Sequence, residues 1–460
     1  MLVVVTHILA KRSYAMPNKK PRVVTLRAIR KASHLTGNIA AKSSHFMGKV
    51  ERRTTRLIIE STGSATGHDS VDVDRLYFDR FPHLFPVHPA LPNVGQRPSV
   101  TVFAFLDPKG FYGGIATLLL VSARLAQELN YDLRIAQTTG YSKDNDVLGF
   151  LASNGIVLPK ERYSTIDLSR RDANNFAYLP FHPDDVVVVS AWWDAHIAAQ
   201  LPLKQKFVYL IQDFEPIFYN NSDEYVLADA TYRTEKFIPV CNTQLLYEYF
   251  KEKNYSYITK HASWFEPAPA PQMKSKLVVP ATKEIRKLFL YGRPAVHRNL
   301  YMSAVKAIDI AFGDERLRDE KWEIYNAGSD NVTSIRLHSG RLIKSLGKMN
   351  LEDYYTWATG IDIAVSPMLA PHPNYPTLEL ASLGAMVVTT KWETKQDLSR
   401  YSRNILMADA TAESMAEAIL QAALTSPAVR QKNLDTTKIN TSWATAFDDV
   451  LPKIANTFRS

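Results

Sequence analysis

The sequence predicts an α/β protein whose body contains two doubly wound domains of similar size. Three observations predict this class: β-rich runs alternate with helical patterns, the alternation occurs in two blocks, and a proline-rich segment separates the blocks. With 460 residues, 46% of them apolar, the chain is long enough to bury several cores. The single cysteine, Cys241, excludes internal disulfides and zinc sites built from several cysteines.

The first block follows a segment with five prolines between positions 82 and 98, which forbid a helix and indicate an extended linker. Four consecutive valines at 186–189 are typical of a parallel strand that is covered on both faces. We expect strands at 99–106, 131–138, 184–193, 206–214 and 236–241, with helices at 115–129 and 245–253.

The second block begins after the segment EPAPAPQ (266–272) and repeats the same alternation, which predicts a second doubly wound sheet. We expect strands at 287–293, 321–328, 361–367 and 385–390, with helices at 300–312, 377–383 and 413–424. The segment 441–458 is predicted to be a helix that is interrupted near Pro452. The predicted domains are a basic extension with linker (1–98), two Rossmann-like domains (99–270 and 271–440) and a C-terminal helix returning to the first domain (441–460).

The positive charge is concentrated at the N-terminus. Residues 1–60 hold thirteen of the 55 Lys and Arg but two of the 46 Asp and Glu, so the rest of the chain is nearly neutral. A nucleic-acid enzyme needs basic residues along its substrate groove, so this distribution argues against nucleic acid as a partner. The basic extension is either a tether to anionic lipid or a solvated helical appendage, and translation starts at either Met1 or Met16.

No apolar run reaches the roughly 18–20 residues that span a bilayer, and the N-terminus lacks the pattern of a secretory signal. We therefore expect a cytoplasmic protein, and the tether alternative places residues 1–60 at the inner face of the membrane.

A glycine-rich loop follows the first expected strand of the body. Gly113 and Gly114 precede the helix at 115–129, where backbone amides and the helix N-terminus favour an anion such as phosphate. The spacing differs from the dinucleotide fingerprint, which disfavours a nicotinamide cofactor. Alternatively, the glycines serve only close packing of strand and helix.

Two arginines, Arg293 and Arg298, follow the first strand of the second block. They suit a diphosphate because each guanidinium donates charge-assisted hydrogen bonds; the alternative for each is a solvated surface position. Ligands of doubly wound sheets bind at the carboxyl ends of the strands, so we expect a site in a cleft between the two domains.

Three prolines stiffen the loop at 366–376 and precede a helix near Thr377. The amides of Tyr375, Thr377 and Leu378 are then free to contact an anion at the start of that helix. Glu379, in the first turn, either complements the helix dipole or accepts hydrogen bonds from a ribose-type hydroxyl.

Together these segments resemble a known family. The stretches FYGGIAT, YLIQDFEPIFY, YGRP with the following RN, LGK and APHPNYPTLE are similar to retaining nucleotide-sugar glycosyltransferases of GT-B architecture, and especially to bacterial dTDP-rhamnose-dependent rhamnosyltransferases. The resemblance covers residues 99–442. It implies transfer of a hexose, L-rhamnose, from a dTDP-sugar to a hydroxyl of a bacterial surface glycan, with retention and without metal or cofactor. The implied partners are the nucleotide-sugar and a lipid-linked glycan acceptor.

The resemblance also implies residue roles. It places diphosphate contacts on Gly114, Arg293 and Arg298, a nucleotide contact near Lys348 and a deoxyribose contact on Glu379. The family usually has two glutamates eight residues apart. Here Pro371 stands eight residues before Glu379, and the next residue, His372, takes the place of the first glutamate as a donor-sugar contact.

The acceptor is expected near the end of the strand at 206–214. Asp213 or Glu215 orients or deprotonates its hydroxyl, and Asp213 is preferred over a purely structural carboxylate. Trp192 and Trp193 either stack on sugar rings or belong to the core. Two other functions suit the same architecture: a nucleotide-sugar epimerase and a non-catalytic glycan-binding protein.

Overall fold

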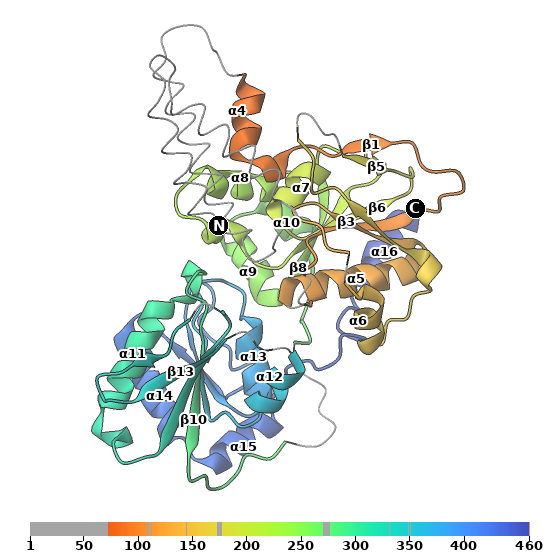
Figure 1. The fold of residues 1–460 in the computed structure, drawn as a ribbon. Helices are drawn as coiled ribbons and strands as arrows, with labels where there is room; N and C mark the ends of the chain where they lie inside the picture. The colour runs from red at the N-terminus through yellow and green to blue at the C-terminus, as the bar shows by residue number, and fades with distance from the viewer. Residues whose placement is uncertain are drawn as a thin grey trace, which may run out of the picture. The chain divides into compact units, whose positions relative to one another are not determined.

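The computed structural model describes most of the chain from residue 72 onward. The basic segment 1–60, both candidate starts and Lys348 lie outside the described residues. The chain divides into two compact units, one comprising residues up to 85 with 172–175 and the other the remainder. In the first unit the structure describes a helix, α4 (Val73–Arg80; Figure 1). The described residues are 72–107, 110–111, 113–143, 145–172, 177–269, 277–330, 332–347, 349 and 351–459.

The first sheet of the larger unit contains seven parallel strands. They are β2 (Ser99–Ala104), β3 (Asp132–Gln137), β4 (Tyr163–Asp167), β6 (Val186–Val189), β7 (Phe207–Ile211), β8 (Phe237–Asn242) and β9 (Ser263–Phe265). Their spatial order is β4-β3-β2-β6-β7-β8-β9, so the direction of winding reverses between β2 and β6. This is the doubly wound arrangement that the alternating pattern predicts.

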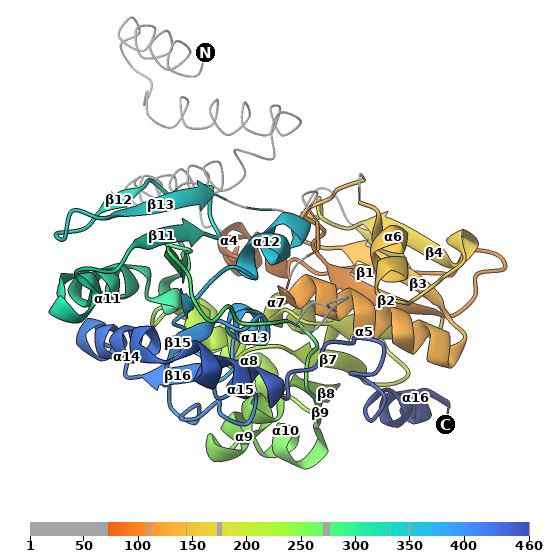
Figure 2. The ribbon, with the colours of Figure 1, turned by 90° about the horizontal axis from the view of Figure 1, so that it is seen from below.

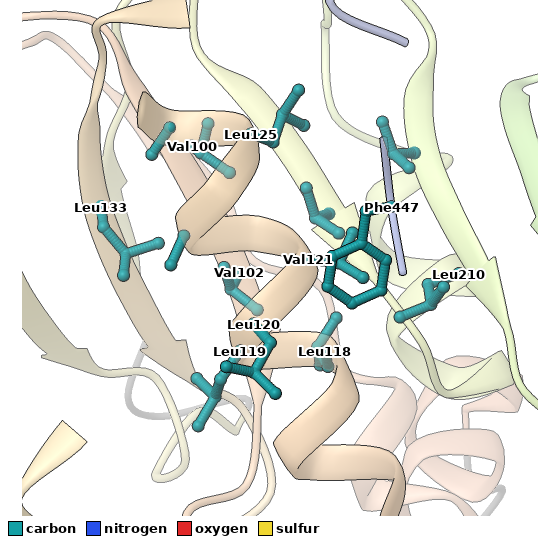
Figure 3. Close-up of a cluster of buried hydrophobic side chains, with 14 of the residues drawn as sticks. Val100, Val102, Leu118, Leu119, Leu120, Val121, Leu125, Leu133, Leu210 and Phe447 are labelled. Atoms are coloured by element: carbon teal, nitrogen blue, oxygen red, sulfur yellow. The ribbon is translucent and has the colours of Figure 1, made fainter. Parts of the chain in front are cut away.

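Helices cover both faces of this sheet, because successive residues of a strand point to opposite faces. Val100 and Val102 of β2 pack with Leu118 and Val121 of the helix α5 (Figure 3), whereas Phe103 packs into the cluster on the opposite face. The helices are α5 (Gly113–Leu129), α6 (Val147–Ser153), α7 (Trp192–Ala198), α8 (Asp223–Tyr232), α9 (Gln244–Glu252) and α10 (Ser256–His261). With 17 residues, α5 is the longest described helix, and no helix of the described ranges is long and apolar enough to cross a membrane.

The second sheet repeats this plan. Its strands are β10 (Arg286–Tyr291), β11 (Trp322–Ala327), β12 (Ile335–Arg336), β13 (Leu342–Gly347), β14 (Ile363–Val365), β15 (Met386–Thr390) and β16 (Ile405–Ala408). The order is β12-β13-β11-β10-β14-β15-β16, in which only β12 is antiparallel to its neighbour. Here the winding reverses between β10 and β14.

Helices also cover both faces of the second sheet (Figure 2). Leu288 and Leu290 of β10 pack toward α11 and α14, whereas Phe289 packs toward α12 and α13. The helices are α11 (Tyr301–Gly313), α12 (Leu351–Ala358), α13 (Tyr375–Ser382), α14 (Ala412–Leu424) and α15 (Pro427–Asp435). The predicted pair of doubly wound α/β domains is therefore confirmed.

Two expectations for the first block need correction. The proline-rich segment before Ser99 is more than a linker, because β1 (His88–Ala90) pairs in parallel with β5 (Tyr178–Pro180). The strand expected at 184–193 ends at Val189, and Trp192 begins a helix instead.

The C-terminal segment returns to the first sheet. The helix α16 (Leu451–Arg459) contacts α5, and the Phe447 ring joins the cluster that contains Val121 and Leu210 (Figure 3). The helix expected over 441–458 was wrong in its first half, because residues 443–450 form turns and the helix begins at Leu451. Pro452 lies in the first turn of that helix, where its missing N–H needs no partner.

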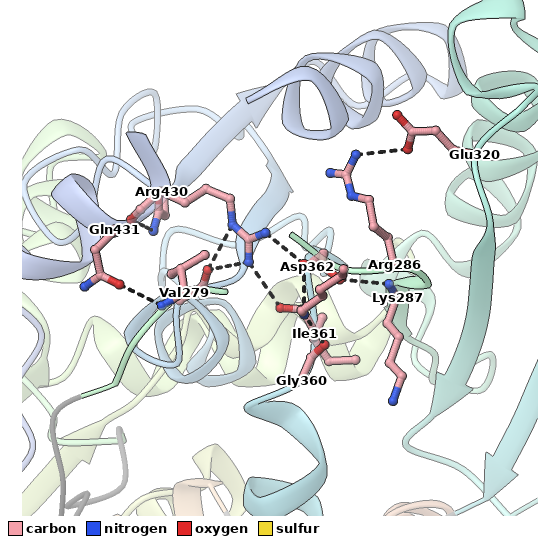
Figure 4. A network of polar contacts seen from close by, with 12 residues as sticks. Val279, Arg286, Lys287, Glu320, Gly360, Ile361, Asp362, Arg430 and Gln431 are labelled. Atoms are coloured by element: carbon pink, nitrogen blue, oxygen red, sulfur yellow. Dashed lines mark hydrogen bonds and ion pairs between the residues drawn. The ribbon is translucent and has the colours of Figure 1, made fainter. Parts of the chain in front are cut away.

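A buried ionic network holds α15 against the second sheet (Figure 4). The Arg430 guanidinium donates to the Asp362 carboxylate at 2.8 Å and to the Gly384 carbonyl at 3.0 Å. The same carboxylate accepts hydrogen bonds from the Lys283 ammonium at 3.0 Å and the Lys287 backbone N–H at 2.9 Å. Arg430 and Asp362 are both buried, so each depends on the other for charge compensation.

We predict that Arg430→Met lowers the free energy of unfolding by about 3–5 kcal/mol, because it leaves the Asp362 carboxylate with less compensation in a buried site. Urea titration followed by circular dichroism measures the change. Arg316→Met is the matched control: Arg316 also pairs with two carboxylates, but it is exposed, and we expect a loss below about 1 kcal/mol. Equal losses in the two variants would contradict the prediction.

Candidate functional site

Contacts between loops of the two sheets define a candidate site. The Tyr375 hydroxyl lies 2.8 Å from the Thr117 hydroxyl and accepts a hydrogen bond from the Asn242 amide at 2.6 Å. Asp213, which follows β7, lies 3.7 Å from Arg298, which follows β10. These residues stand near carboxyl ends of strands or in the first turns of the next helices, where doubly wound sheets bind their ligands.

Local backbone geometry explains why glycines occupy the start of α5. Gly113 begins α5 with a φ of +52°, which disfavours other residues, whereas Gly114 permits a close approach. A Cβ atom on Gly114 would lie 3.2 Å from Nε2 of Gln212, which donates to the Gly114 carbonyl at 2.8 Å. The two glycines therefore fix the start of α5 against the loop that also carries Asp213.

The two arginines differ in their surroundings. Arg293 is exposed, whereas Arg298 is partly buried, with its guanidinium 3.9 Å from the centre of the Phe218 ring. Burial lowers the pKa of Arg298, and the charge of Asp213 opposes this. Nε of Arg298 is buried with no hydrogen-bond partner among the described residues. The Asp213 carboxylate lies 3.7 Å from this Nε, an ion-pair distance that is too long for a hydrogen bond, so a bound anion that accepted a hydrogen bond there would stabilise it.

Asp213 is the carboxylate that faces this arginine. It is 8% exposed, and its pKa is raised by burial but lowered by Arg298, by the Phe214 backbone N–H and by Lys395. Both cations come from loops of the second sheet, so Asp213 acts as their counter-ion in the ligand-free protein.

Glu215 and Trp192 have structural roles, and for Trp192 this is the core alternative that the sequence left open. The Glu215 carboxylate accepts a hydrogen bond from the Trp192 backbone N–H at 2.5 Å at the start of α7, and burial raises its pKa to about 8. The Trp192 indole is 0% exposed and donates to the Tyr219 hydroxyl at 2.8 Å. Stacking of Trp192 on an acceptor sugar was therefore a wrong prediction, and the core alternative holds. Trp193 is half-buried beside it.

The amides at the start of α13 are only partly available. The Leu378 N–H donates to the Asn374 carbonyl at 3.3 Å, so the prediction that it is free for an anion was wrong. Tyr375 and Thr377 occupy the first turn of α13, where amides lack partners within the helix. The Tyr375 side chain reaches the first sheet through Thr117 and Asn242, a contact that the sequence alone did not indicate.

His372 is buried in the loop before α13, where its Nδ1 accepts a hydrogen bond from the Asn374 backbone N–H at 3.0 Å. Burial lowers the pKa of the ring to about 3, with further contributions from Lys395 and Arg298, so the imidazole is neutral at physiological pH. Because Nδ1 accepts, the proton resides on Nε2, which has no partner among the described residues.

Glu379 is half-buried on α13, beside the aromatic residues of α12. Burial raises the pKa of its carboxyl group to about 8, and the Tyr354 hydroxyl works in the opposite direction. A carboxyl group that serves only to complement a helix dipole would be solvated and ionised, so the environment of Glu379 argues against that role alone.

Lys395 is a site residue that sequence reasoning missed. It is 0% exposed, and its ammonium donates to the Met368 carbonyl at 2.9 Å. A lysine in the polar segment KWETKQD gives no local sign of burial, because its partners are backbone carbonyls distant in sequence. Gln212, Thr117 and Asn242 were missed for the same reason.

Within the described part of the chain there is no group of three or more His, Cys, Asp or Glu side chains arranged to hold a metal ion. The donors at the candidate site are instead a guanidinium, a neutral imidazole and backbone amides, which suit an anion or sugar hydroxyls.

Comparison with known proteins places the chain in a family. Residues 101–244 match the N-terminal domain of WsaF, and residues 286–420 match its C-terminal domain. The chain belongs to the WsaF family. The two matched regions contain every candidate site residue that the structure describes, from Gly113 on α5 to Lys395 after β15.

One curated relative of this WsaF-family chain is the O-antigen biosynthesis protein RfbC of Myxococcus xanthus. The two are 27% identical over 276 residues, which is 59% of this chain and 21% of RfbC. The chain therefore spans about a fifth of the length of that relative.

Solved structures with the same fold include Anabaena HepE in complex with UDP and glucose. Its TM-score is 0.56 at 11% identity, covering 78% of this chain and 100% of HepE. Sucrose-phosphate synthase from Thermosynechococcus elongatus has a TM-score of 0.53 at 13% identity, and the match covers 79% of this chain and 98% of that synthase. At such identities the similarity concerns the fold alone, and it confirms the predicted GT-B architecture for this member of the WsaF family.

We predict that Glu379→Gln flattens the pH dependence of stability. The folded-state pKa is about 8, above the ordinary value of 4.5, so the folded state binds a proton that the unfolded state releases. The free energy of unfolding should therefore fall as the pH rises from 4.5 to 8 in the original protein. The difference in unfolding free energy between the variant and the original protein should be about 1–2 kcal/mol more in favour of the variant at pH 8 than at pH 5. This value is reduced because the Glu379 side chain is partly exposed.

Thermal and urea unfolding at pH 5 and pH 8 test this prediction. Glu413→Gln is the control, because Glu413 on α14 is 71% exposed in its side chain and should leave the pH profile unchanged. Identical profiles for Glu379→Gln and the original protein would show that Glu379 titrates as a solvated group.

Proposed function

We propose that the protein is a glycosyltransferase that moves L-rhamnose from dTDP-rhamnose to a hydroxyl of a growing bacterial surface glycan. The observation that carries the proposal is the partly buried Arg298, whose Nε makes no hydrogen bond within the described residues and lies 3.7 Å from the Asp213 carboxylate of the first sheet. Membership of the WsaF family and the GT-B fold support transfer of a sugar, and the name of the relative RfbC supports a surface glycan as product.

The diphosphate of the donor is the group that these residues suit. Arg293, Arg298, the Gly114 amide at the start of α5 and the first amides of α13 supply positive charge and N–H donors from both sheets. Negative charge develops on the β-phosphate as the sugar leaves, so donors aimed there stabilise the transition state more than the ground state. Arginines and amides can supply this stabilisation without a metal ion.

The nucleoside end of the donor is assigned to Glu379, whose carboxylate would accept a hydrogen bond from the deoxyribose hydroxyl. Binding of that hydroxyl favours the ionised carboxylate and so lowers the raised pKa of Glu379. His372 would donate from Nε2 to a hydroxyl of the sugar itself.

The acceptor hydroxyl is proposed to approach Asp213 and to attack the anomeric carbon on the face that the diphosphate leaves, which gives retention. The bond from the anomeric carbon to the β-phosphate oxygen breaks, and the bond to the acceptor oxygen forms. The acceptor proton passes to the departing phosphate oxygen or to Asp213, whose raised pKa suits a base.

We predict that Arg298→Ala lowers kcat/KM with dTDP-rhamnose by about 10²–10³-fold, as removal of one transition-state donor does elsewhere. It should also weaken dTDP binding by about 10–100-fold, and Arg293→Ala should do the same to a smaller extent because Arg293 is exposed. Calorimetry with dTDP and NMR of the product, which reports its anomeric configuration, measure these effects.

Arg318→Ala is the matched control, because Arg318 lies in the same domain with its side chain 66% exposed. A free epimerised nucleotide-sugar formed without acceptor would favour the epimerase alternative. Unchanged dTDP binding in both Arg293→Ala and Arg298→Ala would mean that the nucleotide site lies elsewhere.

We propose that residues 1–60 tether the enzyme to anionic lipid, where a lipid-linked acceptor is found. Each basic residue near such a surface contributes about 1 kcal/mol, so thirteen Lys and Arg suffice for binding. Deleting residues 1–60 should abolish sedimentation with phosphatidylserine vesicles and leave turnover on a soluble acceptor unchanged. Equal sedimentation with and without the segment would rule out the tether, and neutral phosphatidylcholine vesicles are the control.

A further inference from the structure

Lys395 is a buried charge on the loop that follows β15. It is 0% exposed, whereas lysines are almost never fully buried without a partner. Its ammonium donates to the Met368 carbonyl at 2.9 Å and lies 3.5 Å from the His372 carbonyl. Burial lowers its pKa to about 7, and the charge of Asp213 opposes that shift.

The local backbone turns Lys395 inward. Trp392 and Lys395 form an isolated antiparallel bridge, with hydrogen bonds of 3.1 Å and 2.8 Å between their backbones. Glu393, inside this turn, has a φ of +40°, an uncommon value for a residue other than glycine. The tight turn is therefore maintained despite an unfavourable backbone conformation, and it directs the Lys395 side chain to the interior.

The segment that Lys395 contacts is the loop between β14 and α13. Thr390 also holds this loop, because its hydroxyl accepts from the Met368 N–H at 3.0 Å and donates to the Met368 carbonyl at 3.1 Å. The Leu369 N–H donates to the Arg298 carbonyl at 2.8 Å, which links the loop to the arginine segment. The Lys395 ammonium reaches both ends of the Met368–His372 stretch.

His372 is the side chain that this loop presents. Its Nδ1 is occupied by the Asn374 N–H, and Asn374 is itself fixed by a hydrogen bond of 2.8 Å from its side chain to the Ser366 hydroxyl. The ring therefore has one orientation and one tautomer, with the proton on Nε2. That Nε2 is buried without a hydrogen-bond partner in the described chain, so its N–H is available to donate to a ligand.

We propose that Lys395 is a positioning residue whose ammonium fixes the Met368–His372 backbone, so that the His372 Nε2–H donates to a hydroxyl of the donor sugar. The inference rests on the proposed function, since it assumes a nucleotide-sugar donor. Lys395 acts through His372, and neither residue contacts the nucleotide. The sugar-dependent part of donor affinity therefore depends on Lys395, whereas the nucleotide-dependent part does not.

A lysine suits this task better than an apolar residue. It offers three N–H donors at one point, enough for two carbonyls from the same loop, while its charge is balanced by Asp213 of the first domain. The other charged and titratable groups that influence this region are Arg298 and His372, and the latter is neutral. Loss of the ammonium would leave two buried carbonyls with fewer donors and would free the loop to shift.

The test compares the affinities for dTDP and dTDP-rhamnose in the full-length protein without acceptor, measured by calorimetry. In Lys395→Met we expect dTDP affinity within twofold of the original, and dTDP-rhamnose affinity reduced about 10-fold, equivalent to about 1.4 kcal/mol. Lys395→Arg, which keeps the charge and the donors, should recover most of the loss. His372→Ala should lose about as much as Lys395→Met, and the double variant should lose no more than either.

Lys391→Met is the matched control, because Lys391 lies in the same loop but is partly exposed and paired with Asp409. If Lys395→Met does not fold, Lys395→Gln, which retains an N–H donor without charge, takes its place in the comparison with His372→Ala. Unchanged dTDP-rhamnose affinity, or additive losses in the double variant, would overturn the inference. If the original protein binds neither ligand, the proposed function fails instead.

Discussion

The contact between Asp213 and Arg298 is the interaction on which the candidate site depends. Arg298 and Lys395 bring two buried positive charges to the carboxyl end of the second sheet, and such charges are costly without a counter-ion. Asp213 supplies one negative charge from the first sheet, at 3.7 Å from Arg298. A diphosphate would add negative charge beside Arg298, whereas the Lys395 ammonium is already held by the Met368 and His372 carbonyls.

In the second domain, the charged network that stabilises the fold and the residues of the candidate site lie at opposite ends of the strands. Near the amino ends of β10 and β14, the Arg430–Asp362 network satisfies its charges within the protein. Near the carboxyl ends, Arg298 Nε and His372 Nε2 make no hydrogen bond within the described chain, and Nε has only the longer ion pair with Asp213. Polar groups that are fully paired add rigidity, whereas unpaired buried donors are typical of places where a ligand completes the network.

Much of the fold could be predicted from the sequence because strand and helix periodicities are local properties. The alternation of valine-rich strands with helices gave two doubly wound sheets, and strand ends located Gly113, Arg293 and Arg298. Burial by distant residues could not be predicted in this way. Trp192 looked like the end of a strand but lies in the core, and Lys395 looked solvated but is fully enclosed.

A crystal structure of the protein with dTDP tests the central claim most directly. The account predicts that the diphosphate lies between the start of α5 and the side chains of Arg293 and Arg298, with the deoxyribose beside Glu379. It also predicts that Arg298 then binds phosphate through Nε, which in the described part of the ligand-free protein lies 3.7 Å from Asp213 and makes no hydrogen bond. A diphosphate bound away from these side chains, or Arg298 still directed only at Asp213, would contradict the account.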